Sequence, residues 1–140
     1  MVAYGQSKTA NIWMANEIDR RYGAGGLHAL SIHPGNIQTA GYANLDPIFM
    51  EKIGPLFEMK EFQVLFKSVE QGAATQVLAA IGKDYEGKGR LYLDDCRVAP
   101  ALPDDQMIGA YGYRPWAYSP EGESRLWADS LEMVGVKDDQ

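Results

Sequence analysis

The order of predicted elements indicates an α/β fold, in which buried strands are covered by the helices that connect them. Three observations carry this prediction. Residues 3–22 have the residue spacing of a helix, two short apolar runs have the character of strands, and a capped helix lies between these runs. With 140 residues and an apolar fraction of 46%, the chain has the size and composition of one globular domain.

The first half of the chain predicts a helix, a strand and a long loop. Small and apolar residues recur at steps of three or four and predict the helix over residues 3–22: Ala3, Ser7, Ala10, Met14 and Ile18. The glycine run at 23–26 ends this helix, and the apolar run LHALSI at 27–32 predicts a buried strand. Residues 33–47 are predicted as loop, and residues 47–66 as helix in pieces, interrupted by Gly54 and Pro55.

The second half predicts a helix, a strand and a final helix. Ser68 is the predicted N-cap of the next helix, with Gln71 three residues later, and Gly82 is its stop. A second strand is predicted over residues 91–93, and a last helix runs from Ser119 to Met133. The segment between them is irregular and carries aromatic residues that either line a substrate lid or cap the sheet: Tyr111, Tyr113, Trp116 and Tyr118.

Charge and composition exclude several classes of protein. The net charge of -6 and the pI of about 4.8 disfavour nucleic acid as a partner, because phosphate binding needs clustered Lys and Arg. No apolar stretch has the length of a membrane span, and the start lacks the pattern of a secretory signal. The single cysteine, Cys96, cannot form an internal disulfide and is predicted to be buried or half-buried. We expect a reducing, cytoplasmic setting.

Tyr4 and Lys8 are the first candidates for chemistry. Their i, i+4 spacing places them on one helical face, one turn apart. A phenol has a pKa of about 10, and a nearby ammonium stabilises the phenolate and lowers that pKa. Such a tyrosine can exchange a proton with a carbonyl or alcohol oxygen while hydride moves at carbon. The alternative is a surface helix that carries both residues without a shared function.

Two motifs together suggest a family. The sequence YGQSKTAN, followed after one helix and one strand by HPGNIQT, resembles the short-chain dehydrogenase/reductase family. The resemblance is nearest to its retinol-dehydrogenase-like branch, whose C-terminal helix is similar to RLWADSLEMVGV. It implies a Rossmann-type doubly wound α/β fold, of which this chain would hold the C-terminal half, with two to three parallel strands and flanking helices.

The resemblance also implies roles for the first motif. Tyr4 would be the catalytic acid–base, and Lys8 would bind the nicotinamide ribose and depress the pKa of the tyrosine. The cofactor would be NADP or NAD, and the branch resemblance favours NADP slightly. No metal is expected, because His28 and His33 belong to no zinc pattern. The acids in the second half are expected to be solvated: Asp94, Asp95, Asp104 and Asp105.

The second motif would complete the nicotinamide end of the site. Pro34 and Gly35 would turn the chain beside the nicotinamide, at the carboxyl end of the first strand. The Ile37 backbone and the Thr39 hydroxyl would meet the carboxamide and phosphate side of the cofactor. This placement agrees with the rule that ligands bind outside the carboxyl ends of strands in open α/β sheets.

Other parts of the family pattern do not occur in this sequence. The glycine run at 23–26 follows a helix and precedes a strand, whereas a phosphate cradle needs the reverse order. The family's asparagine motif, its catalytic serine and the residue that reads the adenosine ribose have no counterpart, and Ser7 is a different residue. We therefore expect residues 1–140 to form one C-terminal-half domain, with the N-terminal dinucleotide-binding half absent.

Three readings of function stay open at this point. The first is an NAD(P)-dependent oxidoreductase acting on a small carbonyl or alcohol substrate, which the aromatic C-terminal loop suggests to be apolar or aromatic. The second is an inactive fragment or pseudoenzyme that associates through the Tyr4–Lys8 helix with itself, or with a full-length relative. The third is a truncated gene product.

Overall fold

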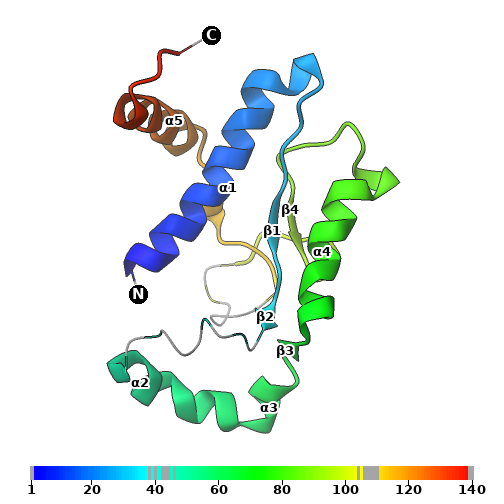
Figure 1. Cartoon of the computed structure of the whole chain (residues 1–140), viewed down its shortest axis with the longest axis vertical. Helices are drawn as coiled ribbons and strands as arrows, with labels where there is room; N and C mark the ends of the chain where they lie inside the picture. Colours follow the sequence, from blue (N-terminus) through cyan, green and yellow to red (C-terminus); the bar gives the residue numbers. More distant parts are fainter. Residues whose placement is uncertain are drawn as a thin grey trace.

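The computed structural model of the protein describes residues 2–37, 39, 41, 45, 47–103, 105 and 111–138 (Figure 1). The helices are α1 (Val2–Tyr22), α2 (Pro47–Glu58), α3 (Lys60–Gln63), α4 (Val69–Ile81) and α5 (Pro120–Val134). The strands are β1 (Ser31–His33), β2 (Asn36–Ile37), β3 (Phe66–Lys67), β4 (Tyr92–Asp94) and β5 (Arg97–Val98). Short 3₁₀ turns lie at η1 (Gly23–Gly25), η3 (Lys83–Tyr85) and η4 (Pro115–Ala117).

The described strands form two small sheets. In the larger sheet β4 pairs in parallel with β1 and antiparallel with β5, in the order β1-β4-β5. A separate parallel pair joins β2 to β3. The predicted α/β class with parallel strands is confirmed. The predicted set of strands was incomplete, because β2 lies inside the predicted loop, β3 begins at residue 66 of the segment predicted as helical, and β5 is the antiparallel return of a tight hairpin.

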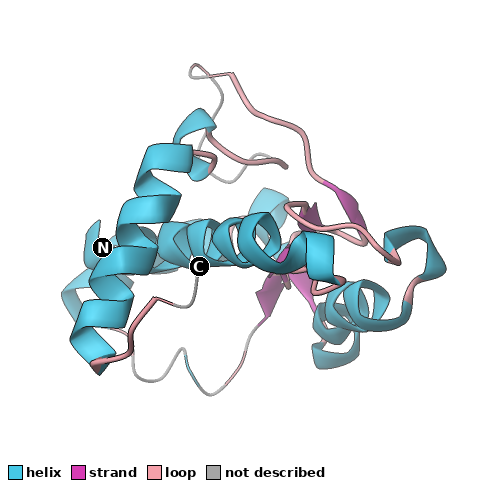
Figure 2. Cartoon of the chain, turned by 90° about the horizontal axis from the view of Figure 1, so that it is seen from above, coloured by secondary structure: helices cyan, strands magenta, loops and turns pink. Residues whose placement is uncertain are grey.

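The helices lie around the strands, and this arrangement sets where α1 begins relative to the carboxyl end of β1. In Figure 1, α1 and α4 lie on either side of β1, and α5 packs against α1. Figure 2, the view from above, shows how small a part of the molecule the strands occupy. Because the chain reverses direction between α1 and β1, the start of α1 and the carboxyl end of β1 lie at a similar level along the long axis of the molecule, with α2 and α3 beyond them (Figure 1).

The first helix and its stop agree with the sequence, but the first strand is shorter than predicted. Gly26 adopts φ 89°, and the N–H of Leu27 donates to the Tyr22 carbonyl at 3.2 Å, which closes the helix end. Only residues from Ser31 onwards pair with β4, and Leu27 is 56% exposed. The prediction of a buried strand over residues 27–32 was therefore wrong for its first four residues, which lie outside β1, although the Ala29 carbonyl still accepts from the Arg90 N–H at 2.9 Å.

Later boundaries agree more closely with the sequence. Helix α2 continues through Gly54 and Pro55, and the break falls at Met59 instead of the predicted position. Ser68 and Gln71 form the predicted capping box, and Gly82 caps the end of α4. The second strand begins at residue 92, one residue later than predicted. The last helix has its N-cap at residue 119, as predicted, and ends one residue later than predicted.

The junction between α1 and α5 is built from polar side chains. Asn16, Glu17 and Glu123 are each at most 1% exposed. The Asn16 amide donates to Glu123 Oε1 at 2.9 Å, whereas Glu17 accepts hydrogen bonds from Arg20 and Arg21. The small-to-apolar stripe that predicted α1 is therefore not the face that is buried most deeply. None of the helices within the described ranges is long and apolar enough to cross a membrane.

Candidate active site

The first two turns of α1 carry Tyr4 and Lys8 on one exposed face. The Lys8 Nζ lies 5.1 Å from the centroid of the Tyr4 ring, and Tyr4 is 67% exposed. A cation over an aromatic face is attracted by the ring quadrupole, so the two side chains stay together in this arrangement. The Ser7 hydroxyl donates to the Tyr4 carbonyl at 2.7 Å, which makes it a bond within the helix.

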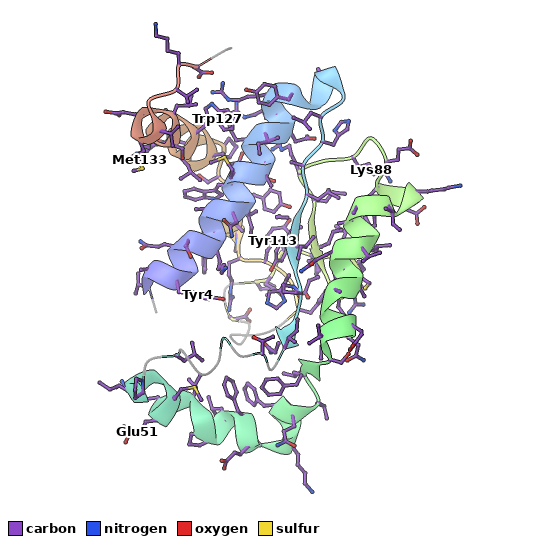
Figure 3. All side chains as sticks on the ribbon, viewed as in Figure 1. Tyr4, Glu51, Lys88, Tyr113, Trp127 and Met133 are labelled. Atoms are coloured by element: carbon purple, nitrogen blue, oxygen red, sulfur yellow. The ribbon has the colours of Figure 1, made fainter. Side chains whose placement is uncertain are left out.

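The second motif forms the short connection from β1 to β2, with a bend in the backbone at Gly35. Gly35 adopts φ 90°, a left-handed conformation that favours glycine, and connects β1 to β2. Pro34 and Ile37 are half-buried, and Thr39 is exposed. Figure 3 labels Tyr4 on the part of α1 that lies at this level of the molecule. The two motifs thus lie at a similar level along the long axis of the molecule, and the roles assigned to their residues stay predictions.

Sequence reasoning missed the residues that hold this bend. Lys67 of β3 lies against Gly35, where an added Cβ would come within 2.6 Å of the Lys67 Cδ. The Ile37 side chain packs on α4 so closely that a Cβ on Gly72 would lie 1.9 Å from Ile37 Cδ1. Gly72 lies inside the predicted helix and does not end it. A glycine at such a position was the signal that could have indicated a close approach.

Charged side chains gather at the same edge of the larger sheet. The Lys67 Nζ donates to Asp95 Oδ1 at 2.8 Å, and this bond lowers the pKa of the Asp95 carboxyl. His33 Nδ1 accepts from the Gly35 N–H at 3.2 Å and lies 3.4 Å from Asp94 Oδ1.

The predicted acids and Cys96 differ in their surroundings. Asp94 lies in β4 beside His33 with its side chain 17% exposed, and Asp95 pairs with a lysine, so neither is the solvated loop acid that was predicted. Asp105 is exposed, and Asp104 lies outside the described residues. Cys96 is exposed, which contradicts the predicted burial, because it sits in the tight turn between β4 and β5 with φ 58°. Among the residues that the structure describes, no group of three His, Cys, Asp or Glu side chains could hold a metal ion.

The aromatic segment packs against β4. Tyr113 stacks near Tyr118 with ring centroids 4.5 Å apart and meets Tyr92 edge-on at 6.2 Å. The Tyr118 hydroxyl donates to the Arg90 carbonyl, and the Tyr111 hydroxyl donates to the Val98 carbonyl. Burial raises the pKa of Tyr92 to about 12. These contacts favour the packing cap over the substrate lid.

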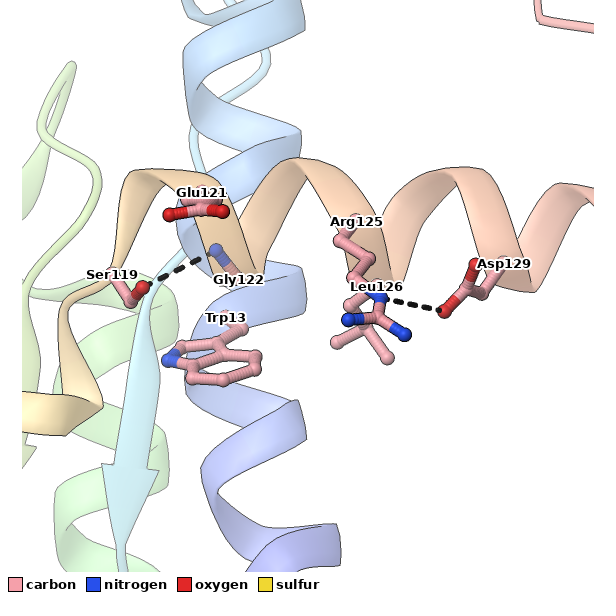
Figure 4. A pocket seen from close by; sticks show the side chains of 7 residues that line it. All are labelled: Trp13, Ser119, Glu121, Gly122, Arg125, Leu126 and Asp129. Atoms are coloured by element: carbon pink, nitrogen blue, oxygen red, sulfur yellow. Dashed lines mark hydrogen bonds and ion pairs between the residues drawn. The ribbon is translucent and has the colours of Figure 1, made fainter.

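A pocket of about 420 Å³ lies elsewhere, between α1 and α5 (Figure 4). The Trp13 indole forms one wall and contacts Gly122, and Arg125 and Asp129 pair at 3.7 Å along α5. The remaining lining residues are Ser119, Glu121 and Leu126. None of the predicted site residues lines this pocket.

Comparison with known proteins gives three informative relatives. The chain is 47% identical over 137 residues to the short-chain dehydrogenase/reductase prx1 of Penicillium roqueforti, covering 97% of this chain and 39% of that protein. It is 44% identical over 142 residues to the oxidoreductase calI of Penicillium decumbens, covering 96% and 40%. It is 32% identical over 135 residues to the human WW domain-containing oxidoreductase, covering 96% and 28%.

These likenesses extend over nearly the whole chain but over a minor part of each relative. The chain spans 39% of the length of the first of these relatives. No family model matches the chain. With almost half of its residues identical to a curated member along 97% of its length, the chain belongs to the short-chain dehydrogenase/reductase family.

Proposed function

We propose that this chain carries the proton-transfer and nicotinamide-binding part of an NAD(P)-dependent oxidoreductase, which reduces a carbonyl compound or oxidises the corresponding alcohol. Tyr4 is the proton donor or acceptor, and Lys8 binds the nicotinamide ribose and stabilises the phenolate. The observation that carries the proposal is the Lys8 ammonium 5.1 Å from the Tyr4 ring, on the part of α1 that is level with the carboxyl end of β1 (Figure 1).

The described residues fit the nicotinamide end of such a cofactor. Tyr4 and Lys8 are exposed, and the Gly35 bend presents backbone at the carboxyl end of β1, where ligands of open α/β sheets bind. Pro34, Ile37 and Thr39 would contact the carboxamide and phosphate side. When bound, the cofactor supplies or accepts the hydride at the carbonyl carbon.

The residues of the chain handle the proton. In the reducing direction the Tyr4 hydroxyl gives its proton to the carbonyl oxygen, so that the carbonyl becomes an alcohol and the tyrosine a phenolate. The positive charge of Lys8 stabilises that phenolate, and solvent then restores the proton. In the oxidising direction the same phenolate accepts the hydroxyl proton of the alcohol.

Some finer features belong to the proposal as well. The family pattern supports a doubly wound sheet for the whole enzyme and NADP in preference to NAD. The aromatic segment before α5 suggested an apolar or aromatic carbonyl substrate, but its packing against β4 removes that support. The single, exposed Cys96 supports a reducing, cytoplasmic setting.

The test compares three variants in an assay of NADPH oxidation with a panel of aromatic and aliphatic ketones and aldehydes. Tyr4→Phe should lower kcat/KM by about 10²- to 10⁴-fold, because it removes only the transferable proton. Lys8→Met should lower it as well, whereas Tyr85→Phe, a tyrosine in η3, should keep the wild-type rate. Equal rates for wild type and Tyr4→Phe would reject the proposed role of Tyr4.

A second candidate function is association with another copy or with a full-length relative. The sequence predicts this association through the Tyr4–Lys8 helix, and α4 offers a second exposed surface: Val77 and Ile81, one turn apart, are 53% and 77% exposed, and Val69 is 64% exposed. Such an apolar face favours a partner. Light scattering distinguishes the two candidates, because a monodisperse monomer across a wide concentration range speaks against association.

A further inference from the structure

The bend between β1 and β2 is held by contacts from β3 and α4, which come later in the sequence. β1 and β2 are only three and two residues long, and Gly35 between them has φ 90°. The ladder to β3 pairs Asn36 with Phe66 and Ile37 with Lys67. So short a ladder does not fix a bend by itself, because isolated two-stranded pairs are marginally stable.

Lys67 connects this bend to the hairpin between β4 and β5. Its side chain lies over Gly35, with Cδ, Cε and Nζ at 2.6, 2.9 and 3.2 Å from the position of an added Cβ. Its ammonium donates to Asp95 Oδ1 at 2.8 Å, and the Lys67 side chain is only 22% exposed. Lysine side chains usually keep the charged end free in water. The Lys67 side chain instead packs on Gly35 along its methylene groups and pairs with Asp95 at its ammonium group.

The hairpin turn between β4 and β5, which carries Asp95, is itself held in place. Asp95 and Cys96 have φ 50° and 58° and form the turn of the hairpin. The Cys96 N–H donates to Thr75 Oγ1 at 3.1 Å, and Thr75 in α4 is fully buried. The hairpin turn is therefore anchored to α4, so Asp95 offers Lys67 a stationary partner.

We propose that Lys67 is a positioning residue for the nicotinamide-binding bend, held by Asp95 and acting through Gly35. This inference rests on the proposed function for its ligand, because the bend is the segment assigned to the nicotinamide carboxamide. Lys67 itself does not contact the ligand. The Lys67 stem fixes where the backbone of residues 35–37 lies, and Asp95 fixes where that stem lies.

Four variants separate the parts of this connection. Lys67→Ala removes the stem and the charge, and Lys67→Met retains the stem alone. Lys67→Arg retains both and is the rescue variant. Asp95→Asn removes the charge that faces both Lys67 and, at 4.0 Å, Arg97, and it keeps the backbone, because asparagine is well tolerated at a positive φ of this kind.

Two measurements are made on the 140-residue chain. The first is amide hydrogen exchange of residues 35–37, read by NMR without ligand, with the amides of α5 as the internal control. The second is the dissociation constant of reduced nicotinamide mononucleotide, which presents the nicotinamide end without the adenosine end. Lys67→Ala and Asp95→Asn should speed amide exchange at the bend by about tenfold. They should also raise the dissociation constant of reduced nicotinamide mononucleotide by a similar factor. Lys67→Met should fall between these and wild type, and Lys67→Arg should restore both values.

The two proposals fail in different ways. If exchange at residues 35–37 is the same in wild type and Lys67→Ala, the positioning role of Lys67 is overturned, whatever the ligand does. If wild type binds no reduced nicotinamide mononucleotide, the proposed function is overturned, and the ligand part of this inference with it. If exchange changes but the affinity of a binding wild type does not, Lys67 supports the fold alone and the positioning role is overturned.

Discussion

Asn16 and Glu123 form a hydrogen bond of 2.9 Å across the junction of α1 and α5, and both side chains are buried. Within the described residues, the amide oxygen Oδ1 of Asn16 and the second carboxylate oxygen Oε2 of Glu123 have no hydrogen-bond partner. Buried polar groups contribute strongly to stability only when they are satisfied, so this pair makes the docking of α5 sensitive to either partner.

Removing both partners should destabilise the protein by less than the sum of the two single removals. Asn16→Leu leaves the Glu123 carboxyl buried without its donor, which should lower the free energy of unfolding by about 1–3 kcal/mol. The double variant Asn16→Leu/Glu123→Leu should lose less than the sum of the single variants. Urea unfolding measures all four members of this cycle, and additive losses would show that the two side chains are not coupled.

Gly72 and Gly54 should respond in opposite ways to the same substitution. Both lie in helices, but a Cβ on Gly72 would overlap Ile37, whereas a Cβ on Gly54 meets nothing within 4 Å. Gly72→Ala should destabilise the fold by about 1–3 kcal/mol through overpacking. Gly54→Ala should stabilise it by up to about 1 kcal/mol through helix propensity. Thermal unfolding compares the two variants, and a stabilised Gly72→Ala would contradict the close packing of Ile37 on α4.

Tyr92 should make the protein less stable in strong alkali. Burial, then repulsion from Asp94 and Tyr118, raises its pKa from 10.0 to about 12 in the folded state. An unfolded chain loses this proton near pH 10, so the stabilising contribution is complete below that pH and is lost as the pH rises to about 12.

Urea unfolding across this range measures the effect. Tyr92→Phe has no proton to lose and should show a shallower decline of the unfolding free energy than wild type. Tyr85→Phe leaves the surroundings of Tyr92 intact and serves as the matched control. A Tyr92→Phe protein with the wild-type decline would show that other groups control alkaline unfolding.

The sequence predicts elements best where local signals are complete. The Ser68 and Gln71 capping box fixes the start of α4, and the glycine run after Tyr22 fixes the end of α1, because both depend on adjacent residues. The strand bounds depend on partners that are distant in the chain. Pairing with β4 decides that β1 begins at Ser31, and no local pattern contains that information.

The same difference between local signals and distant partners applies to the candidate site. The i, i+4 spacing of Tyr4 and Lys8 is a local property, and the structure keeps the two side chains together. Lys67 and Asp95 lie 28 residues apart and meet only through the fold, so the sequence offers no spacing that links them. Asn16 and Glu123 likewise meet only through the fold. A search for apolar residues on α1 does not find them, because both are polar.

The central claim is that Tyr4, Lys8 and the Gly35 bend form one site for a nicotinamide ring. NMR titration of the isotope-labelled chain with reduced nicotinamide mononucleotide tests it most directly, because the amide and ring signals report which residues the ligand meets. We predict saturable shifts of the Tyr4 ring, the Lys8 side chain and the amides of residues 35–37, and none for adenosine monophosphate at the same concentration. Shifts confined to the Trp13 pocket, or no shifts at all, would contradict the claim.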